Sequence, residues 1–399
     1  MDSAVGSAVV VGAGVLGACV SYHLARQGVR VVVVEEARPA AGTSGATFSA
    51  DVTHLKTPYA YYRLNRQGSE EHRQLSEALD GPAWRHPAPL LQWADGDAAH
   101  QALRERALRA KGWGHDCRLA PPSVLRELAP AVDPAACGAD EVVVHESTSW
   151  FDAPRFVHTL LAAAVRHGAE THYGVAVTGL TRKNGRIVGV QAGDRTRSAD
   201  AVVNCAGPGA ARVAAFAGVR LPLRQVPGLV TESDPLPGGP LTAILAAPDI
   251  DLRPTPGGGV LALSWDVDAR LDGADGPRVD GLPQELHRRA GAVLPGLARA
   301  RIEDARIGVR PIPSDGLPLV GEVPGAPGLY HLVSHSAVTL APVLGRLAAR
   351  ELTTGRSAAE LAPYRPDRAV PGDVQDENLR AMNRRRPQPR REPQGETAP

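Results

Sequence analysis

The chain has little that would direct it to nucleic acid or to a membrane. Its 399 residues carry 44 basic and 43 acidic side chains, giving a formal net charge of +1. This balance produces no broad positive field, so we expect no nucleic-acid partner. No apolar run is long enough to span a bilayer, and the opening MDSAVGS lacks the basic and apolar regions of a secretory signal. We therefore expect a soluble, cytoplasmic protein without membrane contact.

Cysteine is also scarce, which limits the metal and redox chemistry that the sequence suggests. The four cysteines are Cys19, Cys117, Cys137 and Cys205, and no two of them form a CxxC pair. Metal sites that can be recognised from sequence show closely spaced cysteine or histidine ligands. The sequence therefore predicts reduced, buried thiols and no bound metal.

The stretch VVGAGVLGACVSYHLARQGVRVVVVEE near the N-terminus is the most informative part of the chain. A β-branched strand meets Gly12, Gly14 and Gly17, a helical segment follows, and a second strand ends at Glu35. Gly12 permits the tight turn, Gly14 lets the backbone approach a pyrophosphate, and Gly17 lets the helix pack on the strand. Glu35 can accept hydrogen bonds from a ribose. The pattern predicts a dinucleotide site, the alternative being a glycine-rich βαβ unit that binds nothing.

Further motifs follow in a fixed order along the chain. They are GTSGAT (42–47), WFDAP (150–154), ADAVVNCAGPGA (199–210), GVRPIPSDGLPLVG (308–321) and GLYHLVSHSAVTLAPVLGRLAARELTTG (328–355). Together with the first motif, this set resembles the D-amino-acid oxidase superfamily of flavoenzymes, which includes glycine and sarcosine oxidases. The resemblance covers roughly residues 7–360.

This resemblance implies an α/β fold. A Rossmann-type, glutathione-reductase-like FAD-binding domain would be interleaved with an α+β substrate domain that carries an antiparallel sheet. The FAD-binding domain is expected at 1–48, 142–218 and 302–364, the substrate domain at 49–141 and 219–301, and a tail at 365–399. A contiguous NAD-binding fold agrees less well with the residues, since the next strands of the parallel sheet are expected only after 142. The tail is Pro- and Arg-rich, so we expect disorder there, the alternative being an arm that contacts nucleic acid or membrane.

The family's cofactor contacts transfer to this chain at the matching motifs. The residues expected to contact FAD are Gly12, Gly14, Val15, Leu16, Gly17, Glu35, Glu36, Thr43, Ser44, Val177, Ala206, Gly207, Ser334, Ser336, Ala337, Val338 and Thr339. Thr43 and Ser44 would contact the pyrophosphate, the alternative being an ordinary polar turn. Many relatives have glycine at the position of Ala337, where a positive φ would strain an alanine. No cysteine follows Cys205 and the hydroxyl loop has no histidine, so we predict non-covalent FAD.

Four residues are candidates for the chemistry itself. The resemblance implies that Arg310 grips a substrate carboxylate, which suits the two parallel hydrogen bonds of a guanidinium, the alternative being a salt bridge to an acid such as Asp315. His335 would face the flavin or the substrate, unless it merely packs or caps. Lys56, one of only three lysines, would assist dioxygen reduction beside the flavin, unless it is a solvated surface lysine. His54 lies in the same segment as Lys56.

The reaction class implied by the resemblance is oxidation of a C–N bond in an amine or amino acid. Hydride transfer to FAD would give an imine, water would hydrolyse it, and dioxygen would be reduced to hydrogen peroxide. The expected partners are thus a small-molecule substrate and dioxygen. The alternatives are a flavin dehydrogenase with another electron acceptor, an NAD(P)-dependent dehydrogenase, and a flavin-binding subunit without turnover.

Overall fold

The glycine motif joins the first strand and first helix of a six-stranded sheet. The computed structural model describes residues 5–236, 238–271 and 279–368. The strands of this sheet are β1 (Ser7–Val11), β2 (Arg30–Glu35), β8 (Glu170–Tyr173), β12 (Ala201–Asn204), β18 (Leu319–Glu322) and β19 (Leu329–Val333). Their order is β18-β19-β12-β1-β2-β8, and all neighbours are parallel except β18 and β19. Three separated parts of the chain therefore build one sheet.

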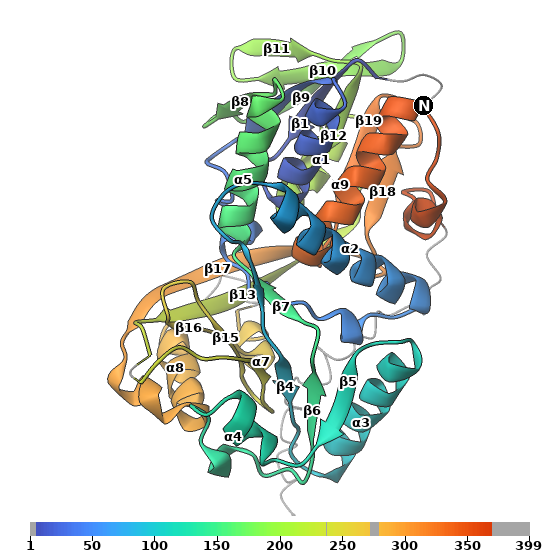
Figure 1. Cartoon of the computed structure of the whole chain (residues 1–399). Helices are drawn as coiled ribbons and strands as arrows, with labels where there is room; N and C mark the ends of the chain where they lie inside the picture. Colours follow the sequence, from blue (N-terminus) through green and yellow to red (C-terminus); the bar gives the residue numbers. More distant parts are fainter. Residues whose placement is uncertain (1–4, 237, 272–278, 369–399) are drawn as a thin grey trace, which may run out of the picture.

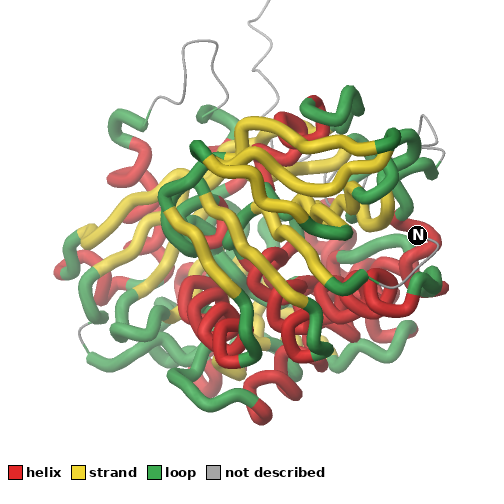
Figure 2. Tube along the Cα trace, turned by 90° about the horizontal axis from the view of Figure 1, so that it is seen from above, coloured by secondary structure: helices red, strands yellow, loops and turns green. Residues whose placement is uncertain are grey.

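Helices cover one face of this sheet and a small antiparallel sheet covers the other (Figures 1 and 2). The helices on the first face are α1 (Val15–Arg26), α5 (Ala153–Arg166) and α9 (Ala337–Thr354), with α2 (Tyr59–Ala78) packed on α9. The small sheet contains β9 (Val177–Lys183), β10 (Arg186–Ala192) and β11 (Arg195–Ser198), and α6 (Ala210–Ala215) packs on the same side through Val213. Ala8 and Val10 of β1 pack in the core with α1, α5 and α9. Val9 and Val11 pack with β9 and β10. A strand buried on both faces explains the unbroken apolar run in the sequence.

An eight-stranded sheet forms the second half of the molecule. Its strands are β4 (Leu90–Gln92), β5 (Cys117–Ala120), β6 (Val142–His145), β13 (Leu223–Ser233), β14 (Ile244–Ala246), β15 (Asp251–Pro254), β16 (Val260–Leu263) and β17 (Ile302–Pro313). The order is β17-β13-β16-β15-β14-β4-β6-β5, and only β14 and β4 are parallel neighbours. The accompanying helices are α3 (Asp97–Gly112), α4 (Val124–Leu128), α7 (Trp265–Asp268) and α8 (Leu282–Val293), and a short ribbon pairs β3 (Arg85–Pro87) with β7 (Ser149–Phe151).

The expected fold class is confirmed, and two strands join a different sheet from the one that their expected domain implied. The boundary at 142 assigned β6 to the FAD-binding domain, whereas β6 pairs with β4 and β5 in the eight-stranded sheet. The boundary at 302 did the same for β17, which pairs with β13 along its length. Both strands are apolar or alternating, and such patterns predict a strand without saying which sheet it joins.

The start of the expected tail is tied to the domain. Arg365 forms an ion pair with Glu351, and Arg368 pairs with Asp315 at 2.7 Å. The remainder of the tail, 369–399, lies outside the described residues. Within the described ranges, every helix is too short or too polar to cross a membrane.

Candidate functional site

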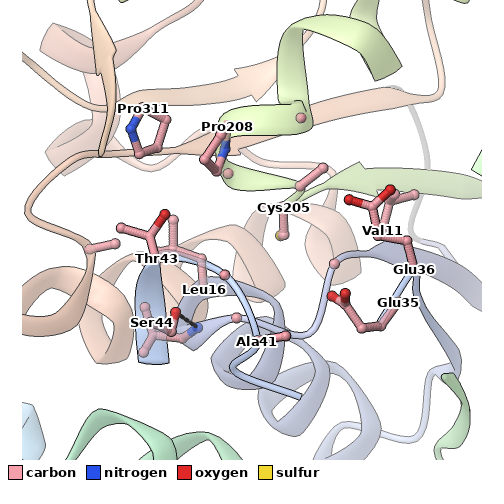
Figure 3. A pocket seen from close by; sticks show the side chains of 18 of the residues that line it. Val11, Leu16, Glu35, Glu36, Ala41, Thr43, Ser44, Cys205, Pro208 and Pro311 are labelled. Carbon is pink, nitrogen blue, oxygen red and sulfur yellow. Dashed lines mark hydrogen bonds between the residues drawn. The ribbon is translucent and has the colours of Figure 1, made fainter. Parts of the chain in front are cut away.

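A cavity of about 400 Å³ opens at the carboxyl end of β1, beside the first turn of α1. Its wall comes from the glycine motif, the end of β2, the loop after β2, the ends of β9 and β12, β17 and the start of α9. In Figure 3, Glu35 and Glu36 lie at one end of the view and Thr43 and Pro311 at the other. Ligands of open α/β sheets bind at this position, outside the carboxyl ends of the strands.

Two glycines of the motif are required by close backbone contacts. Gly12 has φ +104°, and a Cβ there would lie 2.6 Å from the carbonyl oxygen of Cys205. A Cβ on Gly17 would lie 2.0 Å from the carbonyl oxygen of Gly12. Gly12 thus permits the turn and Gly17 permits close packing of α1, which are the two roles expected from the sequence.

Glu35 is held by backbone donors at the floor of the cavity. Its carboxylate accepts hydrogen bonds from the N–H groups of Ala13, at 2.8 Å, and Ala37, at 2.9 Å. The neighbouring Glu36 forms an ion pair with Arg212 at 2.6 Å. Both glutamates line the cavity, but only Glu35 is fixed to the glycine turn.

The hydroxyl loop lies over the start of α1. Ser44 Oγ accepts a hydrogen bond from Val15 N at 3.2 Å, so an oxygen atom already lies at the helix N-terminus. This is the position where helix N–H groups bind phosphate oxygens. The Thr43 hydroxyl instead donates to the carbonyl oxygen of Val309 in β17. Ser44 is therefore the better placed of the two for a phosphate.

Most of the residues expected to contact FAD line this cavity. They are Gly12, Gly14, Val15, Leu16, Glu35, Glu36, Thr43, Ser44, Val177, Ala206, Gly207, Ser334, Ala337 and Val338. Gly17, Ser336 and Thr339 are not among the lining residues. Ala337 begins α9, and it is not among the described residues with positive φ.

Sequence reasoning missed several lining residues. They are Val11, Val34, Ala37, Ala40, Ala41, Gly42, Thr47, Val175, Cys205, Pro208, Gly209, Arg212, Val213 and Pro311. Each lies within a few positions of a motif residue, so extending each motif along the chain would have found them. Arg212 carries the additional signal of its charge on a helix that follows a glycine turn.

Lys56, His335 and the N-terminus of α9 meet near one end of the cavity. Lys56 is only 3% exposed, and its Nζ donates to Ser336 Oγ at 2.7 Å. His335 lines the cavity. Burial, with further contributions from Lys56 and Arg310, lowers the pKa of His335 well below its usual value. The imidazole is therefore neutral at physiological pH, and Lys56 is not a solvated surface lysine.

Arg310 is paired with an acid other than the one considered from the sequence. Its Nη2 donates to Asp268 at 2.6 Å, and its guanidinium lies 4.9 Å from the centre of the Trp265 ring. Asp315 pairs instead with Arg368. The Nη1 atom of Arg310 is buried and has no hydrogen-bond partner among the described residues. Arg310 therefore keeps donor capacity, although Asp268 balances its charge.

His54 packs against another histidine. Like Lys56 and Arg310, it is not among the residues that line the cavity, and its ring stacks on that of His145 with centroids 3.9 Å apart. The 3-10 turn Thr53–Leu55 directs His54 toward the eight-stranded sheet, whereas Lys56, two residues later, reaches α9. Two residues of one short segment therefore contact different parts of the structure, His54 the eight-stranded sheet and Lys56 the start of α9.

Comparison with known proteins agrees with this geometry. The family model for FAD dependent oxidoreductase (DAO) matches residues 7–351. An uncharacterized oxidoreductase, YurR, of Bacillus subtilis is 28% identical over 379 residues, covering 91% of this chain and 99% of that protein. A glycine oxidase of Pseudomonas putida is 27% identical over 373 residues, covering 90% of this chain and 98% of that protein. The crystal structure of glycine oxidase from Geobacillus kaustophilus superposes on this chain with a TM-score of 0.79 at 23% identity, covering 92% of this chain and 99% of that protein.

Proposed function

The chain belongs to the FAD-dependent oxidoreductase family, and from this we propose that it oxidises the C–N bond of a small amine or amino acid. The observation that carries the proposal is that His335 lines the cavity next to Ser336, which accepts a hydrogen bond from the buried Lys56, while the charge of Arg310 also acts on the His335 ring. The glycine oxidase among its relatives supports the same substrate class.

The residues of the cavity fit FAD. Gly14 lines the cavity without a side chain beside Ser44, the first turn of α1 offers N–H groups, and Glu35 offers a carboxylate for ribose hydroxyls. When bound, FAD supplies the acceptor for the hydride of the substrate and then passes the electrons to dioxygen, giving hydrogen peroxide. Because no cysteine follows Cys205 and the hydroxyl loop lacks histidine, we propose that the cofactor is held without a covalent bond.

Arg310 is proposed to orient the substrate. Its free Nη1 N–H can donate to a carboxylate oxygen, and the Asp268 bond fixes the plane of the guanidinium while it does so. This orientation would present the α-hydrogen of the substrate to the FAD cavity. The role is that of a binding group, and Asp268 acts through Arg310 as a positioning residue.

His335 and Lys56 are proposed to act on the amine and on oxygen. His335 lines the cavity, its Nε2 lies 3.4 Å from Ser336 Oγ, and the neutral ring can accept a hydrogen bond from the substrate amine. The buried cation of Lys56 would stabilise the anionic products of dioxygen reduction. No protein base is needed once the amine is neutral, and water hydrolyses the imine.

The proposal is tested by mixing the purified protein anaerobically with a panel of amino acids and amines. We expect a flavin absorption spectrum and bleaching by at least one α-amino acid or N-substituted glycine. Oxidase activity then appears as peroxide release in air. Bleaching without peroxide, but with reduction of an artificial acceptor, would indicate a dehydrogenase. A yellow protein that no amine bleaches would contradict the proposed reaction.

A further inference from the structure

Three histidines meet outside the FAD cavity. His54 comes from the turn before α2, His115 from the link between α3 and β5, and His145 from the end of β6. One ring nitrogen from each lies within 4.8 Å of those of the other two. None of the three lines the cavity. No sequence motif indicates this cluster, because 61 and 30 positions separate its members along the chain.

Two of these rings have nitrogen atoms without an evident function. Nδ1 of His54 and Nε2 of His145 are buried and lack a hydrogen-bond partner among the described residues. Each buried polar atom without a partner lowers the free energy of unfolding by about 1–3 kcal/mol. Nε2 of His115 lies 3.1 Å from Nδ1 of His145. The His145 nitrogen that faces the cluster is therefore Nδ1, while the unpaired Nε2 lies on the other side of its ring. Buried ring nitrogens that face one another, together with an unpaired Nδ1 on His54, are typical of a site that binds an ion or water.

The side chains of the cluster suit metal ligation, because all three offer an imidazole nitrogen. Neutral imidazole is the form that binds a metal. The charges around the cluster are mixed, with Lys56 and Arg106 acting on His54, and Asp51 and Asp116 acting on His115.

We propose that His54, His115 and His145 bind one divalent transition-metal ion of the zinc type, as a site separate from the FAD cavity. Three imidazole nitrogens leave a fourth, tetrahedral position for water. Zn–N distances of about 2.0–2.1 Å place two ligand nitrogens about 3.4 Å apart, which is close to the 3.1 Å between His115 and His145.

Ion binding would require one local adjustment. The His54 and His145 rings are stacked with an interplanar angle of 29°, so their in-plane lone pairs do not converge. Rotation of the His54 ring about its Cβ–Cγ bond would direct Nδ1 to the ion. The ion would then tie the turn before α2 to the β5–β6 edge of the eight-stranded sheet, which gives it a structural role.

The test uses the FAD-loaded full chain, treated with a chelator and then titrated with ZnCl₂ under equilibrium dialysis. We expect one equivalent of zinc, X-ray absorption with nitrogen and oxygen neighbours only, and a zinc-dependent rise in the unfolding temperature. His115→Gln and His145→Ala should each weaken zinc binding at least about 30-fold and abolish the temperature rise. His158→Ala, which removes an exposed histidine on α5, is the matched control.

Because His145 is buried, His145→Ala is informative only if the variant keeps the flavin spectrum, which shows that it is folded. If that spectrum is lost, the test rests on His115→Gln, because His115 is partly exposed. Equal zinc affinity in the wild type, His115→Gln and His158→Ala would overturn the proposal and indicate adventitious surface binding. Sulfur neighbours in the absorption spectrum would overturn it too, by placing the ion at a cysteine.

Discussion

The two ends of the cavity are built in different ways. At the Glu35 end, the ligating groups are backbone N–H groups, glycines without side chains and one carboxylate, and Ala13 and Glu35 are only 22 positions apart. At the Lys56 end, side chains converge from distant parts of the chain, with 280 positions between Lys56 and Ser336. The first end is fixed by a local strand-turn-helix unit, and the second exists only once the two sheets are assembled.

This difference separates the part of the cavity that would hold the cofactor from the part where side chains can be exchanged. At the Glu35 end, the contacts come from the backbone of the glycine turn, so few positions can be substituted without destroying that turn. At the other end, the side chains belong to loops and to the face of a separate sheet, where exchange leaves the turn intact. We expect substitutions at the two ends to be distinguishable, and five predictions test this, from the largest effect to the smallest.

Gly17→Ala should have the largest effect, because the added methyl would lie 2.0 Å from the carbonyl oxygen of Gly12. We expect a loss of about 3 kcal/mol in the free energy of unfolding together with loss of bound FAD. Gly112→Ala adds the same methyl at the end of α3, where no atom lies within 4 Å, and should be neutral or slightly stabilising. Denaturant titration and the flavin content measure both. Equal stability of the two variants would remove the steric argument.

Arg310→Lys should weaken substrate binding without loss of FAD. A lysine cannot bind both Asp268 and a carboxylate in the geometry of a planar guanidinium, so we expect KM to rise about 50-fold, or about 2.3 kcal/mol. Arg306→Lys, on the same strand and paired with Glu232, is the control and should leave KM unchanged. An unaltered KM in Arg310→Lys would refute the carboxylate role.

Glu35→Gln should weaken FAD binding about 15-fold, because a charged acceptor of two backbone hydrogen bonds becomes neutral. Glu36→Gln removes the same charge one residue later, where the carboxylate is paired with an exposed arginine, and should change the FAD Kd much less. Fluorescence titration of the apoprotein with FAD compares them. A larger effect in Glu36→Gln would reverse the assignment of the ribose ligand.

Lys56→Met should slow reoxidation of the reduced enzyme by dioxygen about fivefold. This is the effect expected when the Lys56 charge lowers the activation free energy of that step by about 1 kcal/mol. The half-reaction with substrate should change little, since Lys56 contacts Ser336 rather than Arg310. Lys183→Met, at an exposed position in β9, is the control. Stopped-flow mixing with oxygenated buffer separates the half-reactions, and an unchanged reoxidation rate would exclude the electrostatic role.

His335→Asn should leave the pH profile of kcat/KM in place, which is the smallest effect. Burial holds the pKa of His335 far below its usual value, so the ring is neutral in both the acidic and the neutral range and contributes no ionisation there. The profile should therefore rise with pH only as the substrate amine loses its proton. A limb near pH 6 that disappears in His335→Asn would show that the histidine titrates during turnover.

The sequence predicted the part of the site whose contacts are local. Gly12, Gly17 and Glu35 could be given separate roles because each role depends on residues within one βαβ unit. It also predicted two domains and the family. It did not indicate that β6 and β17 join the eight-stranded sheet or that His54 stacks on His145, because an apolar or alternating segment predicts burial without identifying the neighbour.

The amino-acid sequence by itself determined the turn, the helix and the acidic residue that form the cofactor cradle, since backbone geometry there follows from three glycines and their spacing. Only the tertiary structure decided that Arg310 pairs with Asp268 and that Lys56 reaches α9. It also decided that His54, His115 and His145 meet. These contacts join residues far apart in the chain, and the packing of two sheets, rather than any local pattern, brings such residues within a few ångströms.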